Sequence, residues 1–581
     1  MRAPVSTTSL FEQLARGWRA YALLAMIALS SALMGAGRVP PLDIDEARFA
    51  QATRQMVESG DYVRIRLQDA ERNRKPIGIY WLQAASVHVF EPLTPRVNTI
   101  WPYRVPSALG LLLAALAAFW GGTALIGRRA ALIGAALFAT GLLAGIEGMT
   151  AKTDAVMVGF ITLAIAALAR LRFTQDSPRL LALVFWGALA CDVLIKGVVP
   201  PMAAALTLLT FGLWERRAAW MKPLLWWPGP ALAIAIAAPW LIAIGIVTEG
   251  RFYTDLLRNE LGPKVAGADH AHSGAPGYYL LLLPFLIFPA TYALPAAARL
   301  CWDAVRSRRD DDTHAPFRFL IAWAAPTFIA FELFPTKLVH YTLPVYPAIA
   351  LMCGAGLVAM RGRRWRTTHP AGVVVFAVAG AAIVAIMATV ATFMPGDTGA
   401  DLRRAVSTGL IGVGALAAAI TALFMLRRPT ARALALIACA LVLSFSLRER
   451  LLPEARLLFP SNEAVAALTR ARLLPNDDQA LWVVGYTQPS LVFLTRTSIR
   501  LIDSDRMGDL ARVREGDAMV VEGRKLDEVN AALTARALML APAEPPVRGL
   551  ALGRGERVTL YVGRIMAAVS AEEAGVPRQN P

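Results

Sequence analysis

The sequence predicts an all-α membrane domain with about thirteen transmembrane helices, followed by a small C-terminal α/β domain. Three observations predict this fold. The chain has 581 residues, of which 56% are hydrophobic and only 17% are charged. Its mean hydropathy is +0.49. Short basic clusters alternate with apolar segments that are long enough to cross a bilayer. A soluble protein of this length would carry a larger share of charge on its surface.

The membrane domain is expected over residues 1–450, because this region holds all the long apolar segments. Such a segment must be helical in lipid, where the backbone has no other hydrogen-bond partner. Pro200 and Pro201 leave open whether the fifth and sixth segments are two spans or one kinked helix. The expected spans lie near residues 18–37, 103–126, 130–148, 153–171, 179–196, 198–214, 224–247, 277–298, 317–334, 339–360, 371–394, 404–426 and 431–448.

The basic clusters predict how these spans are oriented. If the N-terminus is cytoplasmic, clusters such as Arg128/Arg129 and Arg427/Arg428 all fall on the cytoplasmic side, as the positive-inside rule requires. This arrangement explains the net charge of +17 without a nucleic-acid partner. The opposite connections are then external. They include the longest polar loop, residues 38–102, and most of the histidines.

This first external loop begins with the acidic motif Asp45-Glu46-Ala47-Arg48-Phe49-Ala50. Apolar residues recur at helical spacing over residues 46–58 and predict an amphipathic helix at the membrane interface. Such a helix would hold Asp45 at the membrane surface. An acidic pair is also common at the start of an ordinary solvated helix, so the motif alone does not establish a function.

Three motifs in this order resemble the bacterial aminoarabinose lipid A transferase family and its protein O-mannosyltransferase relatives. They are Asp45–Ala50, Lys75-Pro76 with Tyr80-Trp81, and Thr150-Ala151-Lys152-Thr153-Asp154. A fourth segment, Thr336–Pro344, resembles the family's external Lys-Leu-Pro-x-Tyr-x-Leu-Pro element. The resemblance covers residues 18–350 and is specific as a set, although each piece alone would be weak.

The resemblance implies a GT-C fold and a glycosyltransferase of the bacterial inner membrane, with its active face in the periplasm. The expected donor is a polyprenyl-phosphate-linked sugar, and the acceptor is a lipid such as lipid A or a glycan. Transfer from such a donor needs a carboxylate that orients or deprotonates the acceptor. It also needs cations that stabilise the departing phosphate.

The resemblance also implies roles for individual residues. Asp45 is the leading catalytic carboxylate and Asp154 is its partner, while Lys75 and Lys196 match the family's phosphate-binding lysines. The alternatives are a helix cap for Asp154 and snorkelling side chains for the lysines at span ends. The further residues expected to contact substrate are Glu46, Arg48, Tyr80, Arg258, Lys337 and Tyr341.

No cofactor is expected to be required, because a lipid-phosphate donor has no pyrophosphate for a metal to neutralise. A divalent metal bound by His270 and His272 is the alternative, but two ligands do not close a metal site. Some family members carry an acidic, metal-binding residue directly before the lysine of the Lys-Pro motif. This chain has Arg74 there, which argues against an inherited metal site.

Residues 455–566 are expected to form the α/β domain on the external face. Strand-length apolar runs at 480–485, 499–502, 518–521 and 559–562 alternate with helical patterns such as 526–538. Residues 567–581 are expected to be a disordered tail. The four cysteines lie in or beside apolar segments without paired spacing, so no disulfide framework is predicted.

Three alternatives to a lipid-modifying enzyme remain. A protein O-mannosyltransferase-like enzyme would share the fold but act on protein side chains. A polytopic transporter would place ionisable residues at mid-depth and often show repeated halves, neither of which is evident here. Finally, the C-terminal domain could bind a partner while the membrane domain only anchors it.

Overall fold

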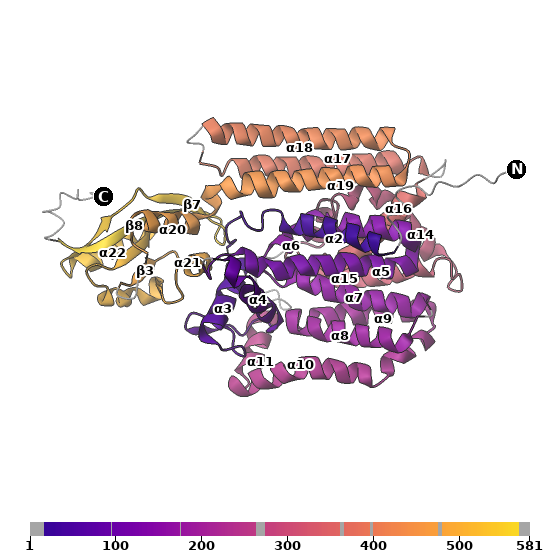
Figure 1. Cartoon of the computed structure of the whole chain (residues 1–581), viewed down its shortest axis with the longest axis horizontal. Coiled ribbons are helices and arrows are strands. Elements are labelled where there is room, and N and C mark those ends of the chain that lie inside the picture. The colour runs from indigo at the N-terminus through magenta and orange to yellow at the C-terminus, as the bar shows by residue number, and fades with distance from the viewer. Residues whose placement is uncertain are drawn as a thin grey trace.

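The computed structural model describes residues 17–568, except for residues 44, 95, 175, 263–273, 361–364, 396–398 and 475–478. His270 and His272 lie outside the described residues. Figure 1 shows long helices that run roughly parallel, with a domain containing a β-sheet at one end of them. The helices come from the first three quarters of the chain and the sheet from the last quarter.

Long apolar helices build the membrane part of the chain. In the part that the structure describes, eight helices are long and apolar enough to cross a membrane, or up to nine if a bent pair forms one span. Two shorter apolar helices are α2 (Trp18–Leu33) and the segment Leu343–Ala359, which contains α16 (Tyr346–Ala359). The eight are α5 (Trp101–Ala139), α7 (Asp154–Phe173), α8 (Pro178–Lys196), α10 (Pro228–Val247), α15 (Ala315–Leu333), α17 (Thr368–Ala391), α18 (Gly399–Met425) and the stretch Pro429–Glu454, which begins with α19 (Pro429–Phe445).

The expected spans all contain helix, and their breaks agree with the prediction in part. The expected break between residues 103–126 and 130–148 is present at Gly127, whose φ of 77° and ψ of 159° are not helical and which divides α5 into two helical parts, and α6 (Leu142–Met149) follows separately. The expected span at 277–298 is the bent pair α13 (Tyr278–Leu286) and Ala290–Arg306, which meet at 111°. Gly197, with φ at 65°, separates α8 from α9 (Val199–Glu215), so the division left open by Pro200 and Pro201 is a real break.

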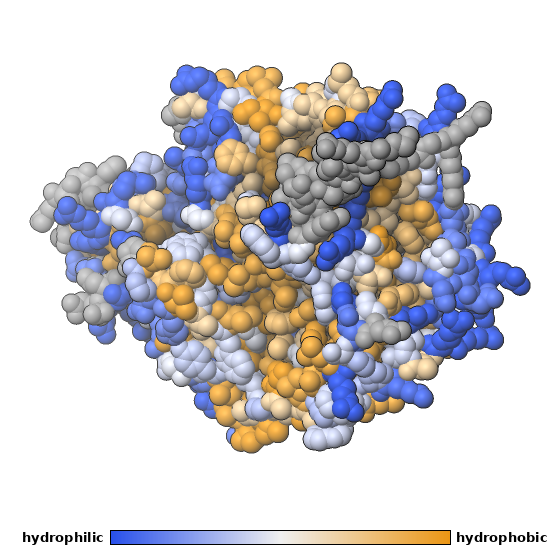
Figure 2. Space-filling model, turned by 45° about the vertical axis from the view of Figure 1, so that its right-hand side comes forward, coloured by the Kyte–Doolittle hydropathy of each residue, from blue (hydrophilic) through white to orange (hydrophobic). Residues whose placement is uncertain are grey.

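The outer surface of the helices is apolar. Only 11% of the most apolar 18-residue stretch of α10 is buried against other parts of the chain. For α18 the buried share of the corresponding stretch is 22%. Figure 2 shows hydrophobic residues over the middle of this face and hydrophilic residues toward its two ends. Exposing so large an apolar surface to water would be energetically unfavourable. These helices therefore face lipid, and the chain is a multi-pass membrane protein.

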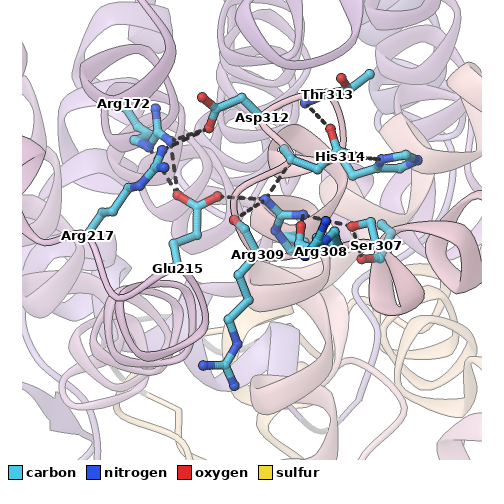
Figure 3. A network of polar contacts seen from close by, with 12 residues as sticks. Arg172, Glu215, Arg217, Ser307, Arg308, Arg309, Asp312, Thr313 and His314 are labelled. Atoms are coloured by element: carbon cyan, nitrogen blue, oxygen red, sulfur yellow. Dashed lines mark hydrogen bonds and ion pairs between the residues drawn. The ribbon is translucent and has the colours of Figure 1, made fainter.

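A buried ionic network ties three helices together at one end of the bundle (Figure 3). Glu215, at the end of α9, accepts hydrogen bonds from Arg172 of α7 at 3.1 Å and from Arg318 of α15 at 3.2 Å. Arg318 also donates to the backbone carbonyls of Arg309 and Asp311, which fixes the loop before α15. Because α7 is 20 residues long, about 30 Å, this network lies far from the start of α7.

The long loop over residues 38–102 folds into two helices joined by a short hairpin. The helix predicted over residues 46–58 is present as α3 (Asp45–Ser59). The hairpin β1 (Arg66–Leu67) and β2 (Ala70–Glu71) follows, and then α4 (Gly78–Phe90). Helix α3 buries Phe49 and Met56, as its spacing predicts, but it also buries Arg54, which donates to the carbonyl of Phe493 at 2.7 Å. Helix α3 therefore packs against the C-terminal domain as well as against α4.

The C-terminal domain contains, among its described residues, a six-stranded mixed sheet with helices packed against it. Strand β3 pairs in parallel with β4 and β5, while β8 pairs antiparallel with β5, β6 and β7. Strands β6 and β7 were not predicted. The bounds are β3 (Leu481–Val484), β4 (Arg500–Ile502), β5 (Ala518–Glu522), β6 (Leu538–Pro542), β7 (Val547–Ala551) and β8 (Glu556–Ala567), with helices α20 (Pro460–Arg470), α21 (Pro489–Leu494) and α22 (Leu526–Thr534).

Candidate active site

A cavity of about 1020 Å³ lies where the membrane helices meet the first loop and the C-terminal domain. Its walls carry charged residues beside apolar ones such as Met157, Phe331 and Phe334. Segments that are far apart in the sequence therefore converge on one space. They are the start of α3, residues 72–76, residues 150–154, the junction of α8 and α9, residues 336–341 and the turn between β7 and β8.

Asp154 and Lys196 form a buried ion pair in the wall of this cavity. Asp154 is the first residue of α7 and Lys196 is the last residue of α8. The Lys196 Nζ lies 2.5 Å from Asp154 Oδ1, and the carboxylate side chain is only 4% exposed. The His340 Nε2 lies 3.7 Å from the same oxygen, and burial lowers the pKa of His340 to about 3. The imidazole is therefore neutral, and Lys196 is the cation that balances Asp154.

Asp45 is the accessible carboxylate of the cavity. Its side chain is 55% exposed at the start of α3, and its Oδ1 lies 3.9 Å from a guanidinium nitrogen of Arg48. Nearby, Asp43 accepts hydrogen bonds from the backbone N–H and the hydroxyl of Ser490, in α21. Burial raises the pKa of Asp43 to about 6. An incoming hydroxyl group can therefore reach Asp45 far more easily than Asp154.

Glu46, which was expected to contact substrate, is held by the protein itself. It accepts hydrogen bonds from Arg104 Nε at 2.7 Å and from Arg104 Nη2 at 2.8 Å, and both side chains are 1% exposed. Its two oxygens also accept the backbone N–H groups of Ala151 and Leu42, each at 2.8 Å. Glu46 thus joins α3, α5 and the turn before α7, and so fixes the position of its neighbour Asp45.

Glu46 is part of the cavity lining, but two other predicted substrate contacts, Tyr80 and Lys337, are not. Tyr80 is fully buried, packs against Phe49 with ring centroids 5.6 Å apart and accepts a hydrogen bond from Arg72 Nε at 3.3 Å. The Lys337 ammonium donates to the carbonyl of Glu332 at 2.6 Å and lies 3.4 Å from the carboxylate of the same residue. Both side chains therefore contact other residues of the protein and stabilise the local fold around the cavity.

The remaining predicted residues divide between the cavity and its surroundings. Arg48, Lys75 and Tyr341 line the cavity. Arg258 does not, although Leu256 and Asn259 on either side of it do.

Sequence reasoning missed several ionisable residues in the lining. Arg72, Arg74, Lys152 and His340 all lie next to or within the motifs, but the pattern gave no reason to select them. The ammonium of Lys152 pairs with Glu147 Oε1 at 3.0 Å. Among the described residues no group of three or more His, Cys, Asp or Glu side chains could hold a metal ion.

Comparison with known proteins agrees with the motifs. Residues 74–242 match the family described as dolichyl-phosphate-mannose-protein mannosyltransferase. The chain is also similar to two undecaprenyl phosphate-alpha-4-amino-4-deoxy-L-arabinose arabinosyl transferases. That of Pectobacterium carotovorum subsp. carotovorum (strain PC1) is 29% identical over 320 residues, which are 54% of each chain. That of Pseudomonas aeruginosa (strain UCBPP-PA14) is 30% identical over 326 residues, 54% of this chain and 55% of the relative. The chain thus matches about half the length of these relatives.

Solved structures extend the likeness over nearly the whole chain. ArnT from Cupriavidus metallidurans, bound to undecaprenyl phosphate, aligns with a TM-score of 0.72 at 20% identity, covering 94% of this chain and 98% of that one. The chain has the GT-C fold. The same ArnT in the apo state gives a TM-score of 0.70 and covers 93% of this chain. The GT-C likeness therefore includes the C-terminal sheet, and the resemblance carried by the motifs is confirmed.

Proposed function

We propose that this chain is a glycosyltransferase that moves a sugar from a polyprenyl-phosphate donor to a lipid or glycan acceptor on the periplasmic face of a bacterial inner membrane. The observation that carries the proposal is that Asp45, Asp154, Lys75 and Lys196 all line one cavity. The names of the similar arabinosyl transferases and the undecaprenyl phosphate bound to the similar ArnT support this class of donor.

The cavity suits a molecule with an anionic head and an apolar chain. Lysine ammonium groups bind phosphate oxygens well, and Lys75 and Lys196 both line the cavity. Apolar side chains such as Met202, Leu256 and Phe334 line it too and can contact the first isoprene units of the donor. Donor binding is therefore assigned to Lys75 as the main phosphate ligand, with Lys196 held nearby by Asp154.

Asp45 is assigned as the group that orients and deprotonates the acceptor. The acceptor oxygen bonds to the anomeric carbon of the sugar while the bond from this carbon to the phosphate oxygen breaks. The acceptor proton passes to Asp45, and the electron pair of the broken bond leaves with the phosphate. Lys75 and Lys196 stabilise the negative charge that gathers on this phosphate.

The proposal is tested by Asp45→Asn with Asp69→Asn as the matched control. Asp69 lies exposed in the β1–β2 turn of the same loop and is not part of the cavity lining. Mass spectrometry of envelope lipids and glycans should show a product one sugar heavier with the unmodified chain and with Asp69→Asn. Asp45→Asn should lower its rate of formation by about 10² to 10⁴. Normal product formation by Asp45→Asn would refute the assignment.

A second candidate function keeps the donor and changes the acceptor to protein side chains. The match of residues 74–242 to the protein mannosyltransferase family is the observation that raises it, whereas the arabinosyl transferase relatives support the lipid or glycan acceptor. In that case envelope lipids and glycans would be unchanged by loss of the chain, and membrane proteins would lose one sugar at Ser or Thr residues. Glycoproteomics of the same cells separates the two acceptors.

A further inference from the structure

A second carboxylate, Asp43, lies in the cavity lining two residues before Asp45, and the transfer step proposed above does not use it. The Asp43 side chain is only partly buried. Its Oδ1 accepts the backbone N–H of Ser490 at 3.1 Å, and its Oδ2 accepts the hydroxyl of the same residue. An ionised carboxylate has about four acceptor positions. Asp43 can therefore accept further hydrogen bonds from a molecule in the cavity.

Three buried hydroxyl groups of the C-terminal domain form a chain that ends at Asp43. The Oγ atoms of Ser490, in α21, and Ser461, in α20, lie 2.6 Å apart. The Ser461 Oγ lies 3.0 Å from the hydroxyl oxygen of Tyr486. Each hydroxyl has a single hydrogen, and an ionised carboxylate can only accept. When Asp43 is ionised, Ser490 donates to it and accepts from Ser461, which in turn accepts from Tyr486.

The charged and titratable groups around Asp43 come from α3 and from the C-terminal domain. Burial raises the pKa of Asp43 to about 6, while the two hydrogen bonds from Ser490 lower it. On α3, the charge of Arg48 lowers this pKa further and the charge of Glu46 raises it. From the C-terminal domain Tyr486 faces Asp43, and burial raises the pKa of this phenol, so it stays neutral. Asp43 is therefore mostly ionised at neutral pH and loses its charge in mildly acidic conditions.

Docking of the C-terminal domain does not by itself require a carboxylate in the cavity wall. Arg54 already joins α3 to α21 through the carbonyls of Phe493 and Thr495. Hydrogen bonds to an ionised carboxylate are stronger than those to a neutral acceptor. A carboxylate that is oriented by the C-terminal domain and lines the cavity is suited to hold a hydroxyl group. Because Asp43 is so close in sequence to Asp45, which is assigned to the acceptor, the same substrate is the one within reach.

We infer that Asp43 is a substrate-binding carboxylate that accepts a hydrogen bond from a hydroxyl group of the acceptor, and that Ser490 is the positioning residue that orients it. The inference rests on the proposed function and gives the C-terminal domain a part in acceptor binding. Asp45 takes the proton of the reacting hydroxyl, while Asp43 holds a second hydroxyl of the same molecule. No bond forms or breaks at Asp43. The acceptor is then a compound with neighbouring hydroxyl groups, such as a sugar ring.

The test uses spheroplasts that carry the full-length chain together with their own donor and acceptor. Mass spectrometry measures the rate at which envelope lipids and glycans become one sugar heavier. The variants are Asp43→Asn and Ser490→Ala, alone and together. Ser504→Ala, at an exposed position of the same domain, and Asp69→Asn are the matched controls. Undecaprenyl phosphate binding and the melting temperature are measured on the same chains after purification in detergent.

Asp43→Asn should lower the rate by about tenfold, because the charged acceptor is lost. Ser490→Ala should lower it by about threefold, because the backbone N–H of this residue still holds Asp43. The double variant should be no slower than Asp43→Asn, since Ser490 acts through Asp43. Undecaprenyl phosphate affinity should be unchanged in all variants, and both controls should form product at the normal rate.

The pH dependence of the rate separates this role from a purely structural one. With the unmodified chain the rate should fall as the external pH falls through about 6, because Asp43 takes up a proton. Ser490→Ala removes a hydrogen bond to the ionised form, so the midpoint of this fall should move to higher pH. Ser504→Ala should keep the original midpoint. Asp43→Asn should lack the fall.

Other results overturn the inference. It fails if Asp43→Asn forms product at the normal rate, if Ser490→Ala leaves the midpoint unchanged, or if either variant weakens undecaprenyl phosphate binding. In these cases the unmodified chain still forms product, so the proposed function survives. If Asp43→Asn does not fold, the pH profile of Ser490→Ala decides alone. If the unmodified chain forms no product one sugar heavier, the proposed function fails, and the inference fails with it.

Discussion

The ion pair between Asp154 and Lys196 should contribute to stability as well as to the proposed phosphate binding. Removing Lys196 would leave a carboxylate that is 4% exposed without its nearest cation. Lys196→Ala should therefore destabilise the chain by about 3 kcal/mol, seen as a lower melting temperature of the purified protein. Lys222→Ala, at an exposed position, is the control. A double variant Asp154→Asn/Lys196→Gln should recover much of the lost stability, because it removes both charges of the pair. An unchanged melting temperature in Lys196→Ala would contradict the ion pair.

Asp43 should make stability depend on pH. Burial raises the pKa of Asp43 from 3.8 to about 6, so the folded chain holds this proton more tightly than the unfolded chain. The contribution of Asp43 to stability is then largest below pH 4 and falls as the pH rises through 6. Melting temperatures of the unmodified chain and Asp43→Asn, measured from pH 4 to 8, should diverge over this range. A constant difference would contradict the shifted pKa.

Residue roles were only partly predictable from the sequence. Asp45, Asp154, Lys75 and Lys196 were selected as a set, and the structure places all four in one cavity. The interactions of Glu46 could not be foreseen, because its partner is 58 positions away in the sequence. The sequence of a loop motif does not show whether a charged side chain contacts a substrate or forms a buried ion pair with another residue of the protein.

The contact between α3 and α21 should hold the C-terminal domain in place. Arg54 donates to the carbonyls of Phe493 at 2.7 Å and Thr495 at 3.1 Å, and its Nε pairs with Glu58 at 2.7 Å. Arg54→Ala should weaken this interface by about 2 kcal/mol and speed limited proteolysis between the two parts. Arg66→Ala is the control. Identical cleavage rates in the two variants would show that the interface does not depend on Arg54.

The turn between β7 and β8 gives the C-terminal domain a direct part in the site. Leu552 and Gly553 line the cavity, although the sheet lies outside the helix bundle. A negative side chain here would repel the anionic donor, so Leu552→Glu should raise the donor KM by about tenfold with a smaller change in kcat. Leu474→Glu, at another exposed position of the same domain, should leave KM unchanged. Equal KM values for the two variants would place the turn outside the donor path.

Elements were easier to predict than the breaks between them. Apolar length predicted where helices occur, and the basic pair Arg128/Arg129 marked the break at Gly127, but the sequence did not predict that the segment after Tyr278 bends by 111°. Such bends depend on the backbone angles of a few residues, and the hydropathy of a segment does not determine these angles. Strand β6 was missed because its apolar residues directly follow the helical pattern expected over residues 526–538, and β7 because Arg548 and Gly549 interrupt its apolar residues.

At the scale of the whole molecule, the two ends of the helix bundle differ in chemistry. One end carries basic loops and the ionic network around Glu215 and Arg318 (Figure 3). The other end carries the cavity, the first loop and the C-terminal domain. This polarity agrees with the alternation of basic and acidic connections along the chain, from which we expect the cavity to face the periplasm.

The central claim is that groups on different segments form one externally accessible, phosphate-binding cavity. This claim can be tested by cysteine labelling in a chain whose native cysteines are replaced. Single cysteines are introduced as Asp45→Cys, Lys75→Cys and Arg217→Cys, and spheroplasts are treated with a membrane-impermeant maleimide. Positions 45 and 75 should label from outside and be protected by undecaprenyl phosphate, whereas position 217 should label only after permeabilisation. Labelling of positions 45 and 75 from opposite sides, or no protection at either, would contradict the account.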